Sequence, residues 1–142
     1  MNTLRRCLFA CTVTLLSLAL VGCGTLNQAQ FQIPDPSGNA ADRERLVAVV
    51  KNAAADAGMV DRTASSKIPN TLVYFEEPVA SFRTTLGART ADGYLIVDLA
   101  CFHFKACETP TYSFMTKSLA DALQAEFGSG WKLVTDPANR IR

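Results

Sequence analysis

The fold is decided by the stretch ASFRTTLGARTADGYLIVDLACFHF, residues 80–104. Two runs that favour extended structure, Ala80–Ala88 and Tyr94–Phe104, flank a short segment, 89–93, that ends in Asp-Gly. Asp-Gly accepts the positive φ angles that a tight two-residue turn requires, so this pattern is typical of a β-hairpin. The stretch therefore predicts two long antiparallel strands joined by a tight turn.

Alternation along these strands predicts two different faces. With a two-residue turn, even positions of the first strand share a face with odd positions of the second, whereas a three-residue loop would exchange the faces. One face is mostly small or aliphatic and is expected to form the core: Phe82, Thr84, Leu86, Ala88, Leu95, Val97, Leu99 and Cys101. The other mixes arginine with apolar side chains, a composition typical of a partner-binding surface: Arg83, Arg89, Tyr94, Ile96, Phe102 and Phe104. Alternatively, arginine stems, Lys105, residues 24–39 or the last segment of the chain shield this second face.

One helix is expected before these strands in the chain and another after them. The first covers Ala40–Ala57, with Asn39 as its N-cap and apolar residues at three- and four-residue spacing. The second covers Pro110–Phe127, because proline favours the first helical position. Short strands over Thr71–Phe75 and Trp131–Val134 complete the order α-β-β-β-α-(β). This order predicts an α+β fold, a two-layer sandwich with both helices on one face of a small antiparallel sheet.

The N-terminus has the parts of a signal peptide. Arg5 and Arg6 form a basic start, and Cys7–Val21 follows without a charge. The uncharged run has about 15 residues, which is shorter than the roughly 20 apolar residues of a membrane-spanning helix. The block therefore indicates a cleaved signal rather than a permanent membrane span.

The end of this block, Leu20-Val21-Gly22-Cys23, resembles the lipobox of bacterial lipoproteins. The resemblance implies removal of residues 1–22, a diacylglyceryl group on the thiol of Cys23 and a further acyl chain on the freed amine. Several acyl chains anchor a protein far more stably than one. By analogy with lipoprotein sorting, Gly24 favours the outer membrane, facing the periplasm, if the host is Gram-negative. An ordinary secretory signal with a chance cysteine is the alternative.

The segment 23–39 is expected to be a lipidated tether, and 40–142 a single domain. The segment is interrupted by Pro34, Pro36 and Gly38 and carries one charged residue, Asp35. The sixteen residues after Cys23, 24–39, would span roughly 20–25 Å on average if flexible. Without the signal peptide the chain is close to electrically neutral, so neither nucleic acid nor an anionic lipid surface is an expected partner.

The cysteines that remain after lipidation suggest a disulfide. The chain has five cysteines, of which Cys7 and Cys11 leave with the signal peptide and Cys23 carries lipid. Cys101 and Cys107 form an even pair in an oxidising compartment, which favours a structural bridge. A redox-active pair or two free thiols are the alternatives, and the pair lacks the C-x-x-C spacing of redox sites.

Neither a metal nor another cofactor is expected, and no catalytic residue is predicted. His103, the single histidine, lies near Cys101, Cys107 and Glu108. Periplasmic thiols would oxidise before they bound zinc, so a structural strand histidine is the simpler interpretation. Glu76-Glu77 precedes Pro78 and is expected to lie in a solvated turn. The two residues do not suit a glycosidase pair, because adjacent residues on a strand point to opposite faces.

The sequence thus predicts a non-enzymatic, membrane-anchored envelope lipoprotein whose domain binds another envelope protein as an accessory subunit. An inhibitor or immunity lipoprotein that neutralises a periplasmic hydrolase is the alternative. A small envelope enzyme is the third interpretation.

Overall fold

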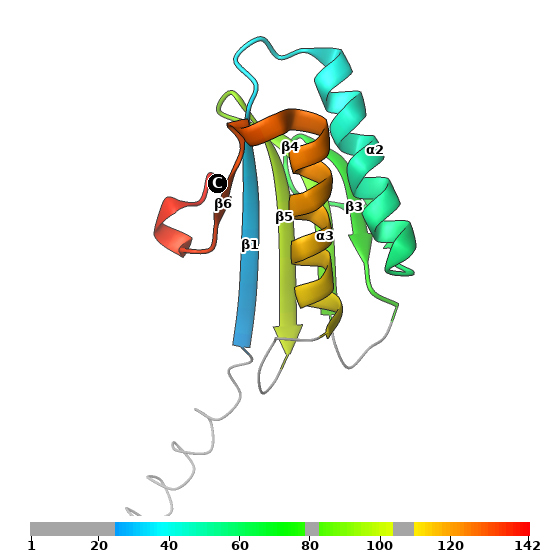
Figure 1. Cartoon of the computed structure of the whole chain (residues 1–142). Helices are drawn as coiled ribbons and strands as arrows, with labels where there is room; N and C mark the ends of the chain where they lie inside the picture. The colour runs from blue at the N-terminus through cyan, green and yellow to red at the C-terminus, as the bar shows by residue number, and fades with distance from the viewer. Residues whose placement is uncertain (1–24, 79–82, 104–109) are drawn as a thin grey trace, which may run out of the picture.

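The computed structural model describes residues 25–78, 83–103 and 110–142, which form a six-stranded sheet with helices on one face (Figure 1). Every paired strand is antiparallel to its neighbour, and the strand order is β2-β3-β4-β5-β1-β6. The elements in chain order are β1 (Thr25–Pro34), α2 (Ala40–Asp56), β2 (Val60–Asp61), β3 (Thr71–Glu76), β4 (Arg83–Ala91), β5 (Tyr94–His103), α3 (Pro110–Phe127) and β6 (Lys132–Val134). Short 3-10 turns occupy Thr63–Ser65, Gly128–Gly130 and Pro137–Asn139.

The predicted hairpin is confirmed as β4 and β5. Ala91 pairs with Tyr94, so Asp92 and Gly93 alone form the turn, with φ angles of 52° and 77°. Positive φ at both central residues matches the right-handed twist of the strands that flank the turn. The register pairs Leu86 with Leu99, and both side chains are fully buried. The core face of the hairpin is therefore the one that alternation predicted.

The two predicted helices are also confirmed. Asn39 caps α2, where its side chain accepts a hydrogen bond from the Ala41 N–H at 3.0 Å. Both helices lie on the same face of the sheet (Figure 1). The buried helix residues that form the core with this face are Leu46, Val50, Ala53 and Ala54 of α2 and Met115, Leu119 and Leu123 of α3. The α+β class and the two-layer arrangement are as expected.

The predicted tether is wrong for residues 25–34, because they form β1 inside the sheet. β1 pairs with β5 along its whole length and with β6 near its C-terminal end. Ala29, Phe31 and Ile33 are buried in the core, since their side chains alternate with polar ones and all point to the helix side. Pro34 does not interrupt the strand because it is its last residue. The folded domain therefore begins close to Cys23 and not at residue 40.

The signal peptide and Cys23 lie outside the described residues. Within the described residues, neither α2 nor α3 has the length and apolar character to cross a membrane.

Candidate binding site on the outer face of the sheet

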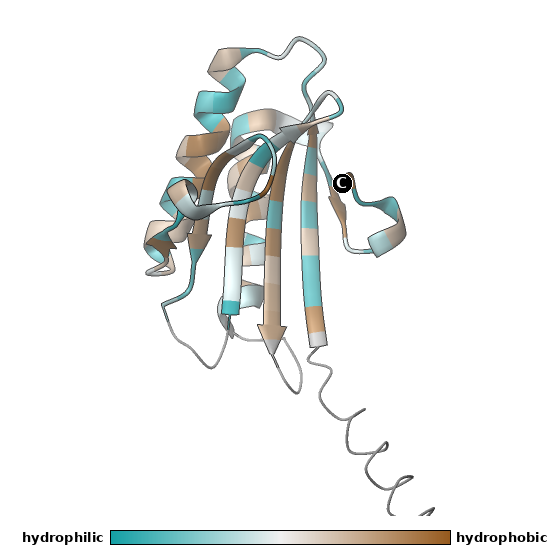
Figure 2. Ribbon diagram, turned by 180° about the vertical axis from the view of Figure 1, so that it is seen from behind, coloured by the Kyte–Doolittle hydropathy of each residue, from teal (hydrophilic) through white to brown (hydrophobic). Residues whose placement is uncertain are grey.

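The face of the sheet opposite the helices is here called the outer face (Figure 2). Neither helix covers it. Residues in register on antiparallel strands share a face, so the outer side chains form rows across β3, β4, β5 and β1. The hairpin row is Thr71, Arg89, Ile96 and Gln32; the central row is Tyr74, Gly87, Asp98 and Gln30; the third row is Glu76, Thr85, Ala100 and Gln28. These rows form a polar site. Alternation along the hairpin predicts only the part of it that lies on β4 and β5, because β1 and β3 contribute the other residues.

An ion pair lies at the centre of the outer face. Arg89 Nε donates to Asp98 Oδ2 at 2.8 Å, and Gln30 Nε2 donates to Asp98 Oδ1 at 2.7 Å. Arg89 Nη2 also donates to the Ile141 carbonyl oxygen at 2.6 Å. Because Arg89 is largely buried and bonded at two atoms, it is a structural part of this face and not a free cation.

The last segment of the chain, residues 135–142, binds to the outer face through its main chain. The Gln30 side-chain amide makes two hydrogen bonds with Ile141: Oε1 accepts from the Ile141 N–H at 2.8 Å, and Nε2 donates to the Ile141 carbonyl at 3.1 Å. Gln32 Nε2 donates to the Asn139 carbonyl at 3.2 Å. Arg140 returns the contact by donating to the Gln28 carbonyl at 3.0 Å and to the Gln28 side-chain oxygen. Side-chain amides of β1 thus recognise the backbone of an adjoining peptide segment.

Part of the predicted exposed surface is covered by the last segment. Ile96 points to the outer face but is 0% exposed. Its register neighbours Gln32 and Arg89 both bond to the last segment, which therefore passes over it. Shielding by this segment was one of the alternatives that the sequence left open, and it holds for Ile96 and Arg89.

The other predicted surface residues have different outcomes. Arg83 and Phe102 are exposed, pair in register, and lie at the end of the sheet remote from the hairpin turn. Tyr94, beside the turn, is half-buried. Phe104 lies outside the described residues.

The predicted disulfide remains a prediction. Cys101 is fully buried on β5, and Cys107 lies outside the described residues. His103 is the last residue of β5. Among the residues that the structure describes, His, Cys, Asp and Glu side chains form no cluster that could hold a metal ion.

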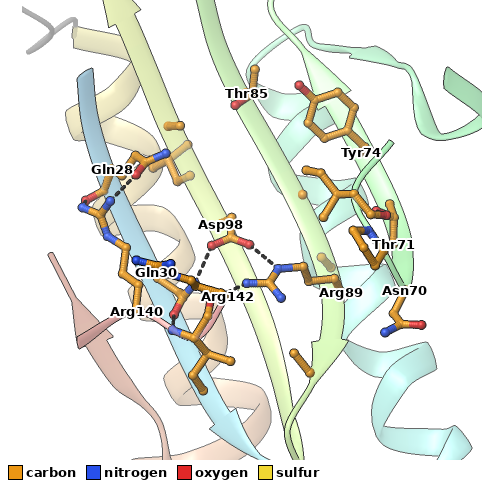
Figure 3. A pocket seen from close by; sticks show the side chains of 18 of the residues that line it. Gln28, Gln30, Asn70, Thr71, Tyr74, Thr85, Arg89, Asp98, Arg140 and Arg142 are labelled. Carbon is orange, nitrogen blue, oxygen red and sulfur yellow. Dashed lines mark hydrogen bonds and ion pairs between the residues drawn. The ribbon is translucent and has the colours of Figure 1, made fainter. Parts of the chain in front are cut away.

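A pocket of about 500 Å³ lies on the outer face beside the last segment (Figure 3). Its floor is formed by small residues of β4 and β5, Thr85, Gly87 and Ala100. Tyr74 and residues 68–70, which precede β3, line it on one side. Four residues of the last segment line it on the other: Pro137, Arg140, Ile141 and Arg142. A volume of this size is within the range of roughly 300–1,000 Å³ that is usual for binding pockets.

Gly87 gives this pocket its shape. A Cβ atom at this position would lie 3.2 Å from Cδ2 of the Tyr74 ring and 3.4 Å from the Val73 carbonyl oxygen. The absence of a side chain therefore allows the ring of Tyr74 to lie close against β4. Glycine within a strand often marks such a close approach.

The Tyr74 hydroxyl belongs to a polar group at the edge of the pocket. It donates to Glu76 Oε1 at 3.1 Å, and Arg83 Nη2 donates to both Glu76 oxygens at 3.0 Å. The bond from Arg83 lowers the pKa of Glu76. Burial, and then the hydrogen bond to Glu76, raise the pKa of Tyr74. At neutral pH the pocket therefore presents a neutral phenol beside an ionised carboxylate that is already paired.

The opposite side of the pocket is cationic. Arg140 and the exposed Arg142 both line it, and Arg140 Nε is buried without a hydrogen-bond partner. The central Arg89 and Asp98 neutralise one another. The site therefore suits a segment that offers carbonyl oxygens or a carboxylate on one side and an apolar contact for Tyr74 on the other.

Most of these residues are not predicted as a site by the sequence. Gln28, Gln30 and Gln32 fall in the predicted tether, although they alternate with the apolar Ala29, Phe31 and Ile33. Such alternation is the pattern of a strand with one buried face. For the last segment no comparable periodic signal is present. Comparison with protein-family models, with curated proteins and with solved structures gives no match.

Proposed function

We propose that this chain is an envelope lipoprotein, anchored through lipid on Cys23, that binds an extended segment of another envelope protein in its outer-face pocket. It would act as an accessory subunit without catalytic activity. The anchor is supported by the lipobox resemblance of Leu20-Val21-Gly22-Cys23. The pocket supports the binding role, because it is a concave site in which a ligand would contact several strands and the last segment at once.

One observation carries the choice of a polypeptide as the ligand. The wall of the pocket is itself a peptide segment whose backbone is held by the Gln30 and Gln32 amides. The same face therefore already has the chemistry of main-chain recognition, which gives affinity for extended peptides irrespective of their sequence. The Tyr74 ring and the arginine side of the pocket would add selectivity for an apolar or acidic side chain.

The expected contact lies away from most of the residues that the hairpin pattern favoured. Ile96 is covered, and Arg89 lines the pocket only as part of its ion pair with Asp98. The floor of the pocket is formed by small residues of the central and third rows. Ala100 is the most useful position for a test, because it lies in the pocket floor between Thr85 and Gln28.

The test is co-purification with Ala100→Trp. An indole at this position would fill the floor of the pocket while the core face of β5 stays unchanged. Ala125→Trp, at an exposed position of α3, is the matched control. Wild-type protein and Ala125→Trp, solubilised from membranes, should retain the same partner, and Ala100→Trp should lose it by at least about tenfold, which corresponds to 1.4 kcal/mol. Full retention by a folded Ala100→Trp variant would show that the pocket does not bind the partner.

A further inference from the structure

Exposed apolar side chains mark one end of the molecule. Leu26 is 55% exposed and Phe102 is 44% exposed, and the two are register partners on β1 and β5. Phe114, 59% exposed, lies in the second turn of α3, which starts at this same end of the sheet (Figure 1). Both layers of the sandwich therefore present a large apolar side chain close to one end, opposite the hairpin turn.

This is the end at which the chain continues toward Cys23. Leu26 is three positions beyond Cys23 in the chain, and three residues span at most about 10–11 Å. β1 pairs with β5 along its whole length. Its first residues therefore belong to the folded domain and do not form a flexible linker to the anchor. The lipid-bearing residue is thus tied directly to the sheet.

The short distance between Cys23 and Leu26 limits how far the domain can lie from the bilayer. The difference between a bilayer of 40–45 Å and a hydrocarbon core of about 30 Å leaves a headgroup layer of roughly 5–8 Å on each side. Acyl chains on Cys23 would fix that residue near the hydrocarbon boundary. Leu26 then cannot lie far beyond the headgroups, because its distance from Cys23 is comparable to the thickness of that layer.

We propose that the end of the domain that carries Leu26, Phe102 and Phe114 rests in the headgroup layer of a lipid bilayer. The inference depends on the lipid at Cys23 that the proposed function assumes, and it adds an orientation. The sheet stands on the membrane, and the pocket opens sideways from its outer face. The third row is two residues beyond Leu26 and the central row four, so the pocket is about 7–13 Å further along the strand.

The contact is apolar rather than electrostatic. Arg83, which shares a row with Phe102, is already bound to Glu76 through both carboxylate oxygens. Zwitterionic lipid should therefore serve as well as anionic lipid, and added salt should have little effect, because surface charge interactions are the ones that salt screens.

Tryptophan emission in brominated vesicles tests this orientation. The lipidated mature protein, residues 23–142, is reconstituted in phosphatidylcholine vesicles with or without brominated acyl chains, as wild type, Phe102→Trp and Phe114→Trp. Wild-type protein has a single tryptophan, Trp131, which precedes β6 and lies well along the sheet from Leu26. Ile68→Trp is the control for an equally exposed site, 44%, near the hairpin end.

Both test variants should lose about half or more of the added emission in brominated vesicles, because side chains that enter the headgroup–acyl boundary come within reach of the bromine atoms. Wild type and Ile68→Trp should be unaffected. If the protein sediments with the vesicles but neither test variant is quenched, the anchor stands and the orientation is overturned. If the protein does not sediment with the vesicles, the anchor itself is refuted and the orientation with it.

Discussion

Replacing Phe31 by alanine tests whether residues 25–34 belong to the folded domain. The Phe31 side chain is fully buried in the core, and its ring centroid lies 5.7 Å from that of Trp131. If this segment were a tether, the substitution would leave the free energy of unfolding unchanged. As part of a strand in the sheet, Phe31 should contribute as a core residue does.

The expected cost of Phe31→Ala is about 4 kcal/mol. Truncation of a buried phenylalanine to alanine costs about 3–5 kcal/mol, from the lost transfer free energy and the cavity that remains. Loss of the tilted contact with Trp131 keeps the value out of the lower part of that range, because aromatic pairs add about 0.5–1.5 kcal/mol. Domains of this kind unfold with about 5–15 kcal/mol, so the variant should remain folded but only marginally stable.

Urea unfolding of a soluble form that begins at Gly24 measures this cost. With a slope of about 2 kcal/mol per molar urea, the midpoint should fall by about 2 M. Phe114→Ala is the matched control, since the same side chain is removed from a site that is 59% exposed. The control should shift the midpoint only slightly. Equal, small shifts for both variants would refute the assignment of β1 to the core.

Four further predictions concern the ionisation of Tyr74, the ionisation of Glu76, the disulfide and the anchor. Glu76→Gln should lower the pKa of Tyr74, measured by phenolate absorbance, because the negative charge of Glu76 adds to the burial and the hydrogen bond that raise it; an unchanged titration would show that an ionised Glu76 does not lie beside the phenol in solution. The pKa of Glu76 is lowered on folding. The stability that its ionised carboxylate contributes is therefore present above the unfolded pKa of about 4.3 and is lost as the pH falls through the folded pKa. The free energies of unfolding of wild type and Glu76→Gln should converge in acid. Without reductant, thiol labelling of the unfolded mature protein should find Cys101 and Cys107 protected, and labelling of both would exclude the bridge. Cys23→Ser should remove the acyl mass from the intact protein and release it from membranes, whereas an unchanged membrane fraction would exclude the lipid anchor.

Local signals were sufficient to predict the hairpin and the helices. Asp92-Gly93 specifies its turn through two adjacent residues, and the cap and apolar spacing of α2 lie within one segment. Such elements are encoded over short distances along the chain, so a sequence pattern contains most of what determines them.

β1 was missed for a different reason. Its alternation of glutamine with apolar residues is visible in the sequence, but the proximity of Cys23, Pro34 and Pro36 favoured a tether. What makes it a strand is pairing with β5, as in the partnership of Phe31 with Val97, far away along the chain. A free strand edge on β5 was the physical clue, because an unpaired edge next to a core needs a neighbour.

The pocket could not be derived from local patterns. Its wall depends on contacts such as that of Gln30 with Ile141, which are 111 residues apart, and the last segment has no periodic pattern to show that it folds back onto the sheet. Gly87 was a partial signal, since glycine inside a strand can mark a close approach, but the approaching group was not evident.

Photo-cross-linking in intact cells tests the central claim, that the outer-face pocket binds another envelope protein. A photoreactive amino acid replaces Thr85 in the pocket floor or, as a control, Ala125 on the exposed surface of α3. We expect a discrete adduct with one envelope protein from position 85, lost when Ala100→Trp fills the pocket, and no such adduct from position 125. An adduct at position 85 that survives Ala100→Trp, or the same adduct from both positions, would contradict it.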